Sequence, residues 1–190
     1  MRSHKVQLIC RKKSKMNRVI SCIFLLSIFG TTLTFAQRPT LSEAHREAMS
    51  KLDFLAGKWK GAGWMMDQSG QRNEFQQTEN IQFKLDESIL MIEGEGTSNG
   101  QTIHDALAII SYDPNEESYQ FRSYLATGQN GDYKAELLSE KSLRWILDTP
   151  RGKIRYTINI DEEGKWSEIG EFQMGPEKWF QFFAMDLVKE

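Results

Sequence analysis

Cysteine is almost missing from this chain. The 190 residues contain 2 Cys, Cys10 and Cys22, and both precede residue 37. Residues 37–190 can therefore form no disulfide, supply no thiolate nucleophile and build no cysteine metal site.

Histidine is scarce as well. His104 begins a predicted strand, where a lone histidine is usually a surface or hydrogen-bonding residue, and His45 is the only other histidine after residue 36. We therefore expect no metal site.

Basic side chains are under-represented after residue 36. Only 17 of the 24 Lys and Arg follow Ala36, against all 26 Asp and Glu, so residues 37–190 carry a net charge of −9. An acidic domain is repelled by phosphate backbones, which argues against nucleic acid and anionic membrane surfaces as partners. The length suits a single domain with an ordinary core.

Motifs of the common enzyme classes are also absent. The sequence has no Gly-x-Ser-x-Gly elbow, no phosphate loop, no His-Glu-x-x-His and no convincing serine–histidine–aspartate spacing. Gly94 and Gly96 with Gly100 have the wrong spacing for a dinucleotide fingerprint, and no helix is predicted to follow them. No residue is therefore predicted to be catalytic on the basis of a known motif.

The first 36 residues have the parts of a secretory signal. A basic region without acidic residues precedes an apolar run from Val19 to Ala36, and Thr34-Phe-Ala36 is typical of a cleavage site. A single membrane anchor is the alternative, because the run is nearly long enough to span a bilayer. We expect cleavage, hence no stable membrane anchor, and an exported protein, periplasmic or extracellular. Residues 1–15 are interpreted as a mis-called start ahead of Met16.

Residues 37–56 are predicted to form a lead-in and a short capping helix. Thr40 is a suitable N-cap with Glu43 at capping-box spacing. An apolar stripe follows at steps of three and four, and Gly57 is expected to stop the helix. The stripe comprises Leu41, Ala44, Ala48, Leu52 and Leu55, flanked by His45 and Met49.

From Gly57 onward the hydrophobic period changes to two, which predicts a barrel domain over 57–190. The predicted strands are 57–66, 73–85, 88–97, 104–113, 118–126, 132–139, 142–148, 153–160, 165–174 and 178–188. The links are short turns such as Asn99-Gly100 and Gly175-Pro176, so neighbouring strands must be antiparallel. The predicted fold is all-β: a ten-stranded antiparallel up-and-down barrel with the helix closing one end. An open sandwich is the alternative.

Aromatic side chains dominate the faces predicted to point inward. They are candidates for binding one small ligand, or else they fill the barrel as an ordinary core. This set comprises Trp59, Phe75, Phe83, Tyr112, Phe121, Tyr133, Trp145, Tyr156, Trp166, Trp179 and Phe183.

Polar residues interrupt the same predicted faces. Gln77 and Glu79 share a row with Phe75, Glu168 follows Trp166 by two, and Gln181 follows Trp179 by two. A buried carboxylate is costly unless paired, so these residues either line a cavity with water or ligand or face solvent through a register slip. If Glu79 and Glu168 converge, they are weak candidates for a general acid–base pair.

The first strand carries a resemblance to known barrels. Gly57-x-Trp59-x-Gly61-x-Gly63, preceded by Leu52-Asp-Phe-Leu55, resembles the opening of calycin-type barrels, is similar to nitrobindin-like ones, and is closer still to bacterial lipocalin-like domains of unknown function. Ala106–Asp113 followed by Tyr119 fits the same group, and the resemblance spans roughly residues 45–188. It implies a ten-stranded barrel with a helix over one end and a central cavity.

Haem is implied only by the nitrobindin branch of this resemblance. That branch uses a histidine near its C-terminal strands as the iron ligand, and no histidine follows His104 here. We therefore expect no haem and no other cofactor.

Three functional hypotheses follow from the sequence. The first is an exported lipocalin-like barrel that binds a small, largely apolar ligand without catalysis. The second is a filled barrel that acts as a structural or protein-interaction module. The third is a cavity enzyme of the isomerase or hydratase type that uses Glu79 and Glu168.

Overall fold

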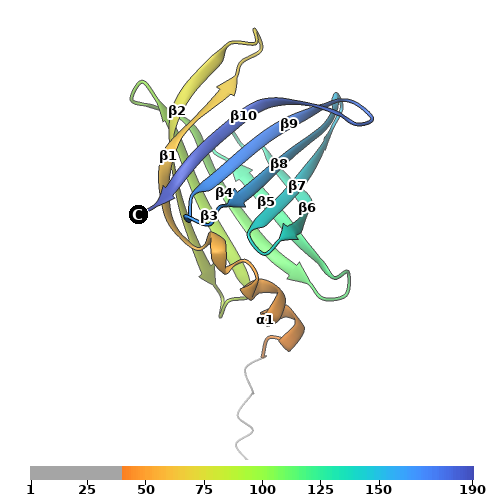
Figure 1. Ribbon diagram of the computed structural model, residues 1–190. Coiled ribbons are helices and arrows are strands. Elements are labelled where there is room, and N and C mark those ends of the chain that lie inside the picture. The colour runs from red at the N-terminus through yellow and green to blue at the C-terminus, as the bar shows by residue number, and fades with distance from the viewer. Residues whose placement is uncertain (1–39) are drawn as a thin grey trace, which may run out of the picture. The chain divides into compact units, whose positions relative to one another are not determined.

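The computed structural model describes residues 40–190, which form a closed barrel with a short helix at one end (Figure 1). Every neighbouring pair of strands is antiparallel, and the order around the barrel is β1-β10-β9-β8-β7-β6-β5-β4-β3-β2. The elements are α1 (Glu43–Ser50), the 3-10 turn η1 (Asp53–Leu55), β1 (Gly57–Met66), β2 (Arg72–Lys84), β3 (Ile89–Ser98), β4 (Gln101–Asp113), β5 (Ser118–Leu125), β6 (Asn130–Ser139), β7 (Ser142–Thr149), β8 (Gly152–Ile160), β9 (Trp166–Gly175) and β10 (Lys178–Lys189).

The predicted all-β barrel is confirmed, and the alternative of an open sandwich is wrong. Every predicted strand is present, with ends within three residues of those observed. Turn chemistry explains this agreement. Asn99 and Gly100 both have positive φ, 51° and 75°, as a tight two-residue hairpin between right-twisted strands requires.

The helix begins and ends differently from the sequence prediction. Ser42 is the N-cap in place of Thr40, and its hydroxyl accepts a hydrogen bond from the backbone N–H of His45 at 3.2 Å. α1 ends at Ser50, well before Gly57, because the chain tightens into η1. This tightening buries Met49, which the predicted stripe left at its flank, while Ala44 stays exposed.

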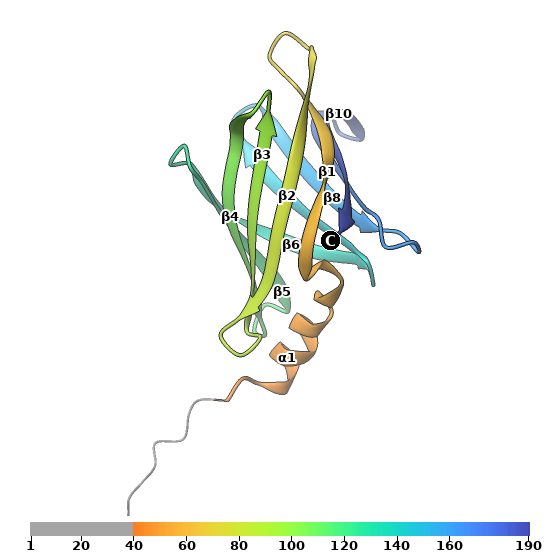
Figure 2. The same cartoon turned by 90° about the vertical axis from the view of Figure 1, so that its left-hand side faces the viewer.

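α1 and η1 together close one end of the barrel (Figures 1 and 2). Met49, Leu52 and Leu55 are completely buried there. The Tyr119 hydroxyl donates to the Ala48 carbonyl oxygen at 2.7 Å, and Trp59 Nε1 donates to the Leu55 carbonyl oxygen at 2.8 Å. Both bonds tie carbonyls of the two helical turns to side chains of the barrel wall.

The signal sequence, its alternative as an anchor and the proposed start at Met16 all lie outside the described residues. Within residues 40–190, α1 and η1 are too short and too polar to count as candidate membrane-crossing helices.

Candidate functional site

A row of aromatic rings follows the inner wall across six strands. Phe121 stacks on Trp145 with ring centroids 4.6 Å apart, and Trp145 stacks on Tyr156 at 5.3 Å. Tyr156 meets Phe183 edge-on at 5.8 Å, and Phe183 stacks on Phe75 at the same distance. We call these residues, together with Tyr133, which lies 6.5 Å from Phe121, the aromatic row. All six were predicted to face inward.

The remaining predicted aromatics at the helix end belong to the core. Trp59 and Trp166 pack edge-to-face with centroids 5.3 Å apart, and both are buried. Tyr112 packs on Tyr119 at 5.3 Å, and Phe83 is half-buried against the same cluster. These aromatic residues lie beneath α1 and η1, where they fill the core at the closed end of the barrel.

Trp179 and Gln181 do not lie on the predicted inner row. β10 contains a bulge between Gln181 and Phe183, so Phe182 is an extra residue and the alternation reverses beyond it. Gln181 is exposed, and the ring of Trp179 stacks under the Arg155 guanidinium at 4.0 Å. The bulge brings Phe182 against Tyr156 instead, with centroids 6.0 Å apart.

Three polar side chains lie buried beside the aromatic row, a placement that the sequence left open. The exposed fractions are 4% for Gln77, 8% for Glu79 and 6% for Glu168. Gln77 Nε2 donates to Glu79 Oε1 at 2.8 Å across one inner face of β2. We call these three residues the polar cluster.

Burial sets the protonation of the polar cluster. It raises the pKa of Glu79 to about 7, against the lowering effect of the Gln77 hydrogen bond. Burial also raises the pKa of Glu168 to about 8, and the negative charge of Glu79 raises it further. The two carboxyls are therefore close enough to influence each other, and near neutral pH they hold protons that ordinary carboxyls have lost.

Tyr156 connects the aromatic row to the polar cluster. Burial raises the pKa of the Tyr156 hydroxyl, and the charge of Glu168 and the neighbouring Tyr133 raise it further. Tyr156 is thus influenced by a residue of the aromatic row on one side and by a carboxyl of the polar cluster on the other.

Glycines make room for this cluster. A Cβ on Gly94 would lie 2.7 Å from Glu79 Oε2, and one on Gly96 would lie 2.7 Å from Gln77 Oε1. Gly61 and Gly63 of β1 stand opposite Gln77 and Phe75. A Cβ on Gly63 would lie 2.5 Å from the Phe75 ring, whereas one on Gly61 would collide with the backbone of Asp186 on β10.

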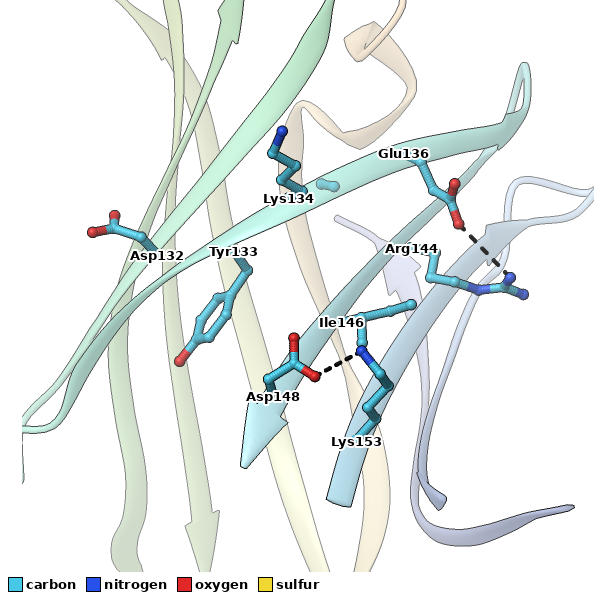
Figure 3. A pocket seen from close by; sticks show the side chains of 9 residues that line it. Asp132, Tyr133, Lys134, Glu136, Arg144, Ile146, Asp148 and Lys153 are labelled. Carbon is cyan, nitrogen blue, oxygen red and sulfur yellow. Dashed lines mark hydrogen bonds and ion pairs between the residues drawn. The ribbon is translucent and has the colours of Figure 1, made fainter. Parts of the chain in front are cut away.

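The barrel wall opens between β6 and β7. Their pairing stops at Ala135 and Trp145, so residues 130–134 and 146–149 have no partner across this seam. A cavity of about 510 Å³ lies there. Figure 3 shows Tyr133 pointing into this opening, with the Lys153–Asp148 ion pair (2.7 Å) at its margin. The sequence carries no signal for this opening, because both strands alternate regularly.

A second hollow of about 670 Å³ is lined by residues of β1 to β5. The buried Trp59 and Glu79 line it together with the exposed Glu93, Glu95 and Asp105. Residues 40–190 contain no group of three or more His, Cys, Asp or Glu able to hold a metal ion.

The two described histidines lie outside the aromatic row. His45 Nε2 lies 2.9 Å from the Ser88 carbonyl oxygen at the helix end, and His104 is exposed at the far end of β4. The C-terminal strands, where nitrobindin-like barrels place the iron ligand, contain no histidine.

The comparisons with known proteins identify the fold. No family model matches the chain, and no curated protein matches its sequence. Rv2717c from M. tuberculosis has a similar structure with a TM-score of 0.53 at 12% identity, covering 80% of this chain and 99% of that one. The S-type phycobiliprotein lyase CPES from Guillardia theta gives 0.53 at 10% identity, covering 80% and 98%. With the closed ten-strand topology, these likenesses make the fold a lipocalin-like barrel.

Proposed function

We propose that this barrel binds one small, largely apolar molecule non-covalently in its interior. The observation that carries the proposal is the aromatic row, which runs from the wall opening at Tyr133 to the buried polar cluster at Glu168. Apolar rings with a few converging polar groups are the usual lining of a small-molecule site.

The wall opening supplies the access route in this proposal. Its volume of about 510 Å³ lies within the range of ligand pockets. Tyr133 belongs both to the cavity lining and to the aromatic row. A ligand that enters between β6 and β7 therefore meets the tyrosine first and the stacked rings of Phe121 and Trp145 next.

Tryptophan fluorescence tests the proposal directly. We expect titration with fatty acids, retinoids and porphyrins to give saturable quenching by at least one of them. Trp145→Phe should remove most of that response, because Trp145 lies in the aromatic row. Trp64→Phe is the matched control, since its ring stacks with Arg72 at 3.8 Å, away from the row. Absence of quenching by every ligand, or equal responses in both variants, would contradict the proposal.

A second candidate function is acid–base catalysis by Glu79 and Glu168. It is favoured by two neighbouring carboxyls whose pKa values are raised to about 7 and about 8, since a group that titrates near the working pH transfers protons most effectively. This function requires a turnover of the isomerase or hydratase type that Glu168→Gln abolishes. If that variant retains the full turnover, the carboxyls are not catalytic.

We further propose that the protein is exported after removal of residues 1–36 and acts in the periplasm or outside the cell, without a haem, among the bacterial lipocalin-like domains that its first strand resembles. The proposal is supported by the basic and apolar leader and by the lack of histidine after His104. N-terminal sequencing of the exported protein should begin at Gln37. A chain that keeps its leader in the membrane would overturn the cleavage.

A further inference from the structure

Charge is divided unequally between the two ends of the barrel. Four turns lie at the end that α1 closes, residues 85–88, 114–117, 140–141 and 161–165. Five lie at the opposite end, residues 67–71, 99–100, 126–129, 150–151 and 176–177 (Figures 1 and 2). Counted with one flanking residue on each side, the turns at the closed end carry nine Asp and Glu against three Lys and Arg, a net charge of −6. Those at the opposite end carry two Asp and Glu against three Lys and Arg, a net charge of +1.

Apolar side chains are exposed at this opposite end. Residues 40–190 have eight exposed large hydrophobic residues, and five of them lie two or three residues from its turns: Met65, Ile103, Tyr124, Met174 and Phe180. We call these five residues the apolar rim. None of them has Asp, Glu, Lys or Arg as a neighbour in the sequence. Exposed apolar side chains that gather where charges are few mark a contact surface.

The shape of the apolar rim favours a fluid partner. Met65, Met174 and Phe180 lie on the adjacent strands β1, β9 and β10, whereas Ile103 and Tyr124 lie on β4 and β5, in a different arc of the barrel. A folded protein partner requires one continuous patch with complementary shape. A lipid bilayer adapts to both arcs at once.

Tryptophan and arginine accompany the apolar rim. Trp179 precedes Phe180, and the Arg155 guanidinium lies 4.0 Å from the centre of its ring. Trp64 precedes Met65, and the Arg72 guanidinium lies 3.8 Å from the centre of its ring. Indole rings and basic side chains next to apolar tips are typical of membrane interfaces, where they lie among the lipid headgroups.

The acidic turns do not oppose contact with lipid at this end. β2 runs between the two ends and has 13 residues. With the tilt of barrel strands, the ends are thus roughly 30 Å apart. The Debye length at physiological salt is about 8 Å, so the repulsion expected from the net charge of the domain is screened across this distance. Arg72, Arg151 and Lys178, in contrast, lie beside the apolar rim.

We propose that the end of the barrel away from α1 docks reversibly on a lipid bilayer, with the apolar rim at the boundary between headgroups and acyl chains. This inference goes beyond the proposed function and does not depend on a ligand in the interior. Met65 is paired with Phe183 of the aromatic row across β1 and β10, so docking brings the bilayer close to one end of that row.

Sedimentation with phosphatidylcholine vesicles tests the inference on the chain that begins at residue 40. This chain lies within one compact unit and contains every element of the barrel, and it lacks the apolar run of residues 19–36. We expect it to bind the vesicles. Met174→Ser/Phe180→Ser should weaken this binding by about tenfold or more, because two apolar side chains no longer enter the lipid. Added phosphatidylglycerol should leave the binding of the parent equal or stronger.

The matched control is Leu85→Ser/Val188→Ser. It removes two side chains from the closed end that are 75% and 59% exposed, against 61% for Met174 and 48% for Phe180. Its binding should stay within about twofold of the parent.

Tryptophan quenching by phosphatidylcholine brominated near its headgroup gives a second measurement on the full chain. All 5 Trp follow residue 36, so the leader can attach the chain to vesicles without contributing emission. We expect the bromine to quench part of the emission of the parent. Trp64→Phe/Trp179→Phe should lose most of this quenching, because the remaining Trp59, Trp145 and Trp166 are buried.

The outcomes decide the inference separately from the proposed function, which depends on titration with soluble ligands. The inference fails if the parent chain does not sediment with the vesicles, in which case a protein is the better partner for the apolar rim. It also fails if Met174→Ser/Phe180→Ser binds as well as Leu85→Ser/Val188→Ser, or if phosphatidylglycerol abolishes binding. Equal quenching in Trp64→Phe/Trp179→Phe and the parent would overturn the orientation of the barrel on the bilayer and thus the inference.

Discussion

Glu168 lies between rings and backbone with little contact with water, and this makes the stability of the barrel depend on pH. A carboxyl in the unfolded chain titrates near 4.5, whereas burial raises the pKa of Glu168 in the folded protein to about 8. Between these values the folded state holds a proton that the unfolded state has lost. The free energy of unfolding therefore falls as pH rises through this window.

Glu168→Gln removes the part of this dependence that Glu168 contributes, while Glu79, whose pKa burial raises to about 7, keeps its own. We expect the variant to exceed the parent in unfolding free energy by roughly 4 kcal/mol near pH 8.5, where the parent carries the buried charge, and to match it to within about 1 kcal/mol near pH 5. Urea denaturation at the two pH values measures the difference. Glu93→Gln, an exposed carboxyl, should shift neither value appreciably. If the unfolding free energy of Glu168→Gln still differs between the two pH values as much as that of the parent, Glu168 is not the source of the pH dependence.

At the residue scale, the sequence identifies which groups are unusual but only partly where they lie. Gln77, Glu79 and Glu168 stand out because polar residues interrupt apolar rows. Their burial depends on strand register, which neighbouring strands determine. The N-cap at Ser42 in place of Thr40 reflects the same limit: both are good caps, and packing of Met49 under the barrel selects between them.

At the element scale, β10 shows why alternation alone is insufficient. Both of its rows are apolar enough to face inward, so the sequence does not reveal the extra residue at Phe182. Gly170 of β9 lies opposite Phe183 beside the bulge, and a Cβ there would lie only 2.8 Å from the Tyr156 ring and 3.0 Å from the Phe183 Cβ, so the glycine permits this close packing. The alternation therefore predicted the wrong face for Trp179 and Gln181, but the correct face for Phe183 on the C-terminal side of the bulge.

The seam between β6 and β7 should be the weakest part of the wall. Residues 130–134 and 146–149 pair only with β5 and β8, so the backbone groups that face the seam lack ladder hydrogen bonds. We expect their amide protons to exchange at least about tenfold faster than amides in the continuous β8–β9 pairing, by hydrogen exchange and NMR. A saturating ligand should slow this exchange. If amides at the β6–β7 seam exchanged as slowly as amides in the β8–β9 pairing, this would contradict an opening in the wall.

At the scale of the whole molecule, closure depends on the last strand. β10 pairs with both β1 and β9, and it supplies the buried Met185 and Leu187. Contacts between strands so distant in the sequence form late and cooperatively. The barrel is thus complete only when the C-terminal segment is in place.

Deletion of residues 176–190 should therefore abolish folding, with loss of a sigmoidal urea transition measured by circular dichroism. It leaves two unpaired strand edges and exposes the core of the closed end. The control is a chain that begins at residue 40, which retains every element in the barrel and should unfold in one cooperative step. A cooperative transition in the deletion variant would show that nine strands suffice.

The glycines that surround the polar cluster have a consequence for how such proteins diverge. The chemistry of the cluster is carried by Glu79 and Gln77, but the space for it is created by Gly94 and Gly96 on the adjacent strand. A homologue that retained the acid while acquiring alanine at either glycine would have to reposition its carboxyl. The geometry of the cluster thus depends as much on the side-chain atoms that Gly94 and Gly96 lack as on the polar groups of Glu79 and Gln77, so a substitution at either glycine would reshape the cluster without changing its chemistry.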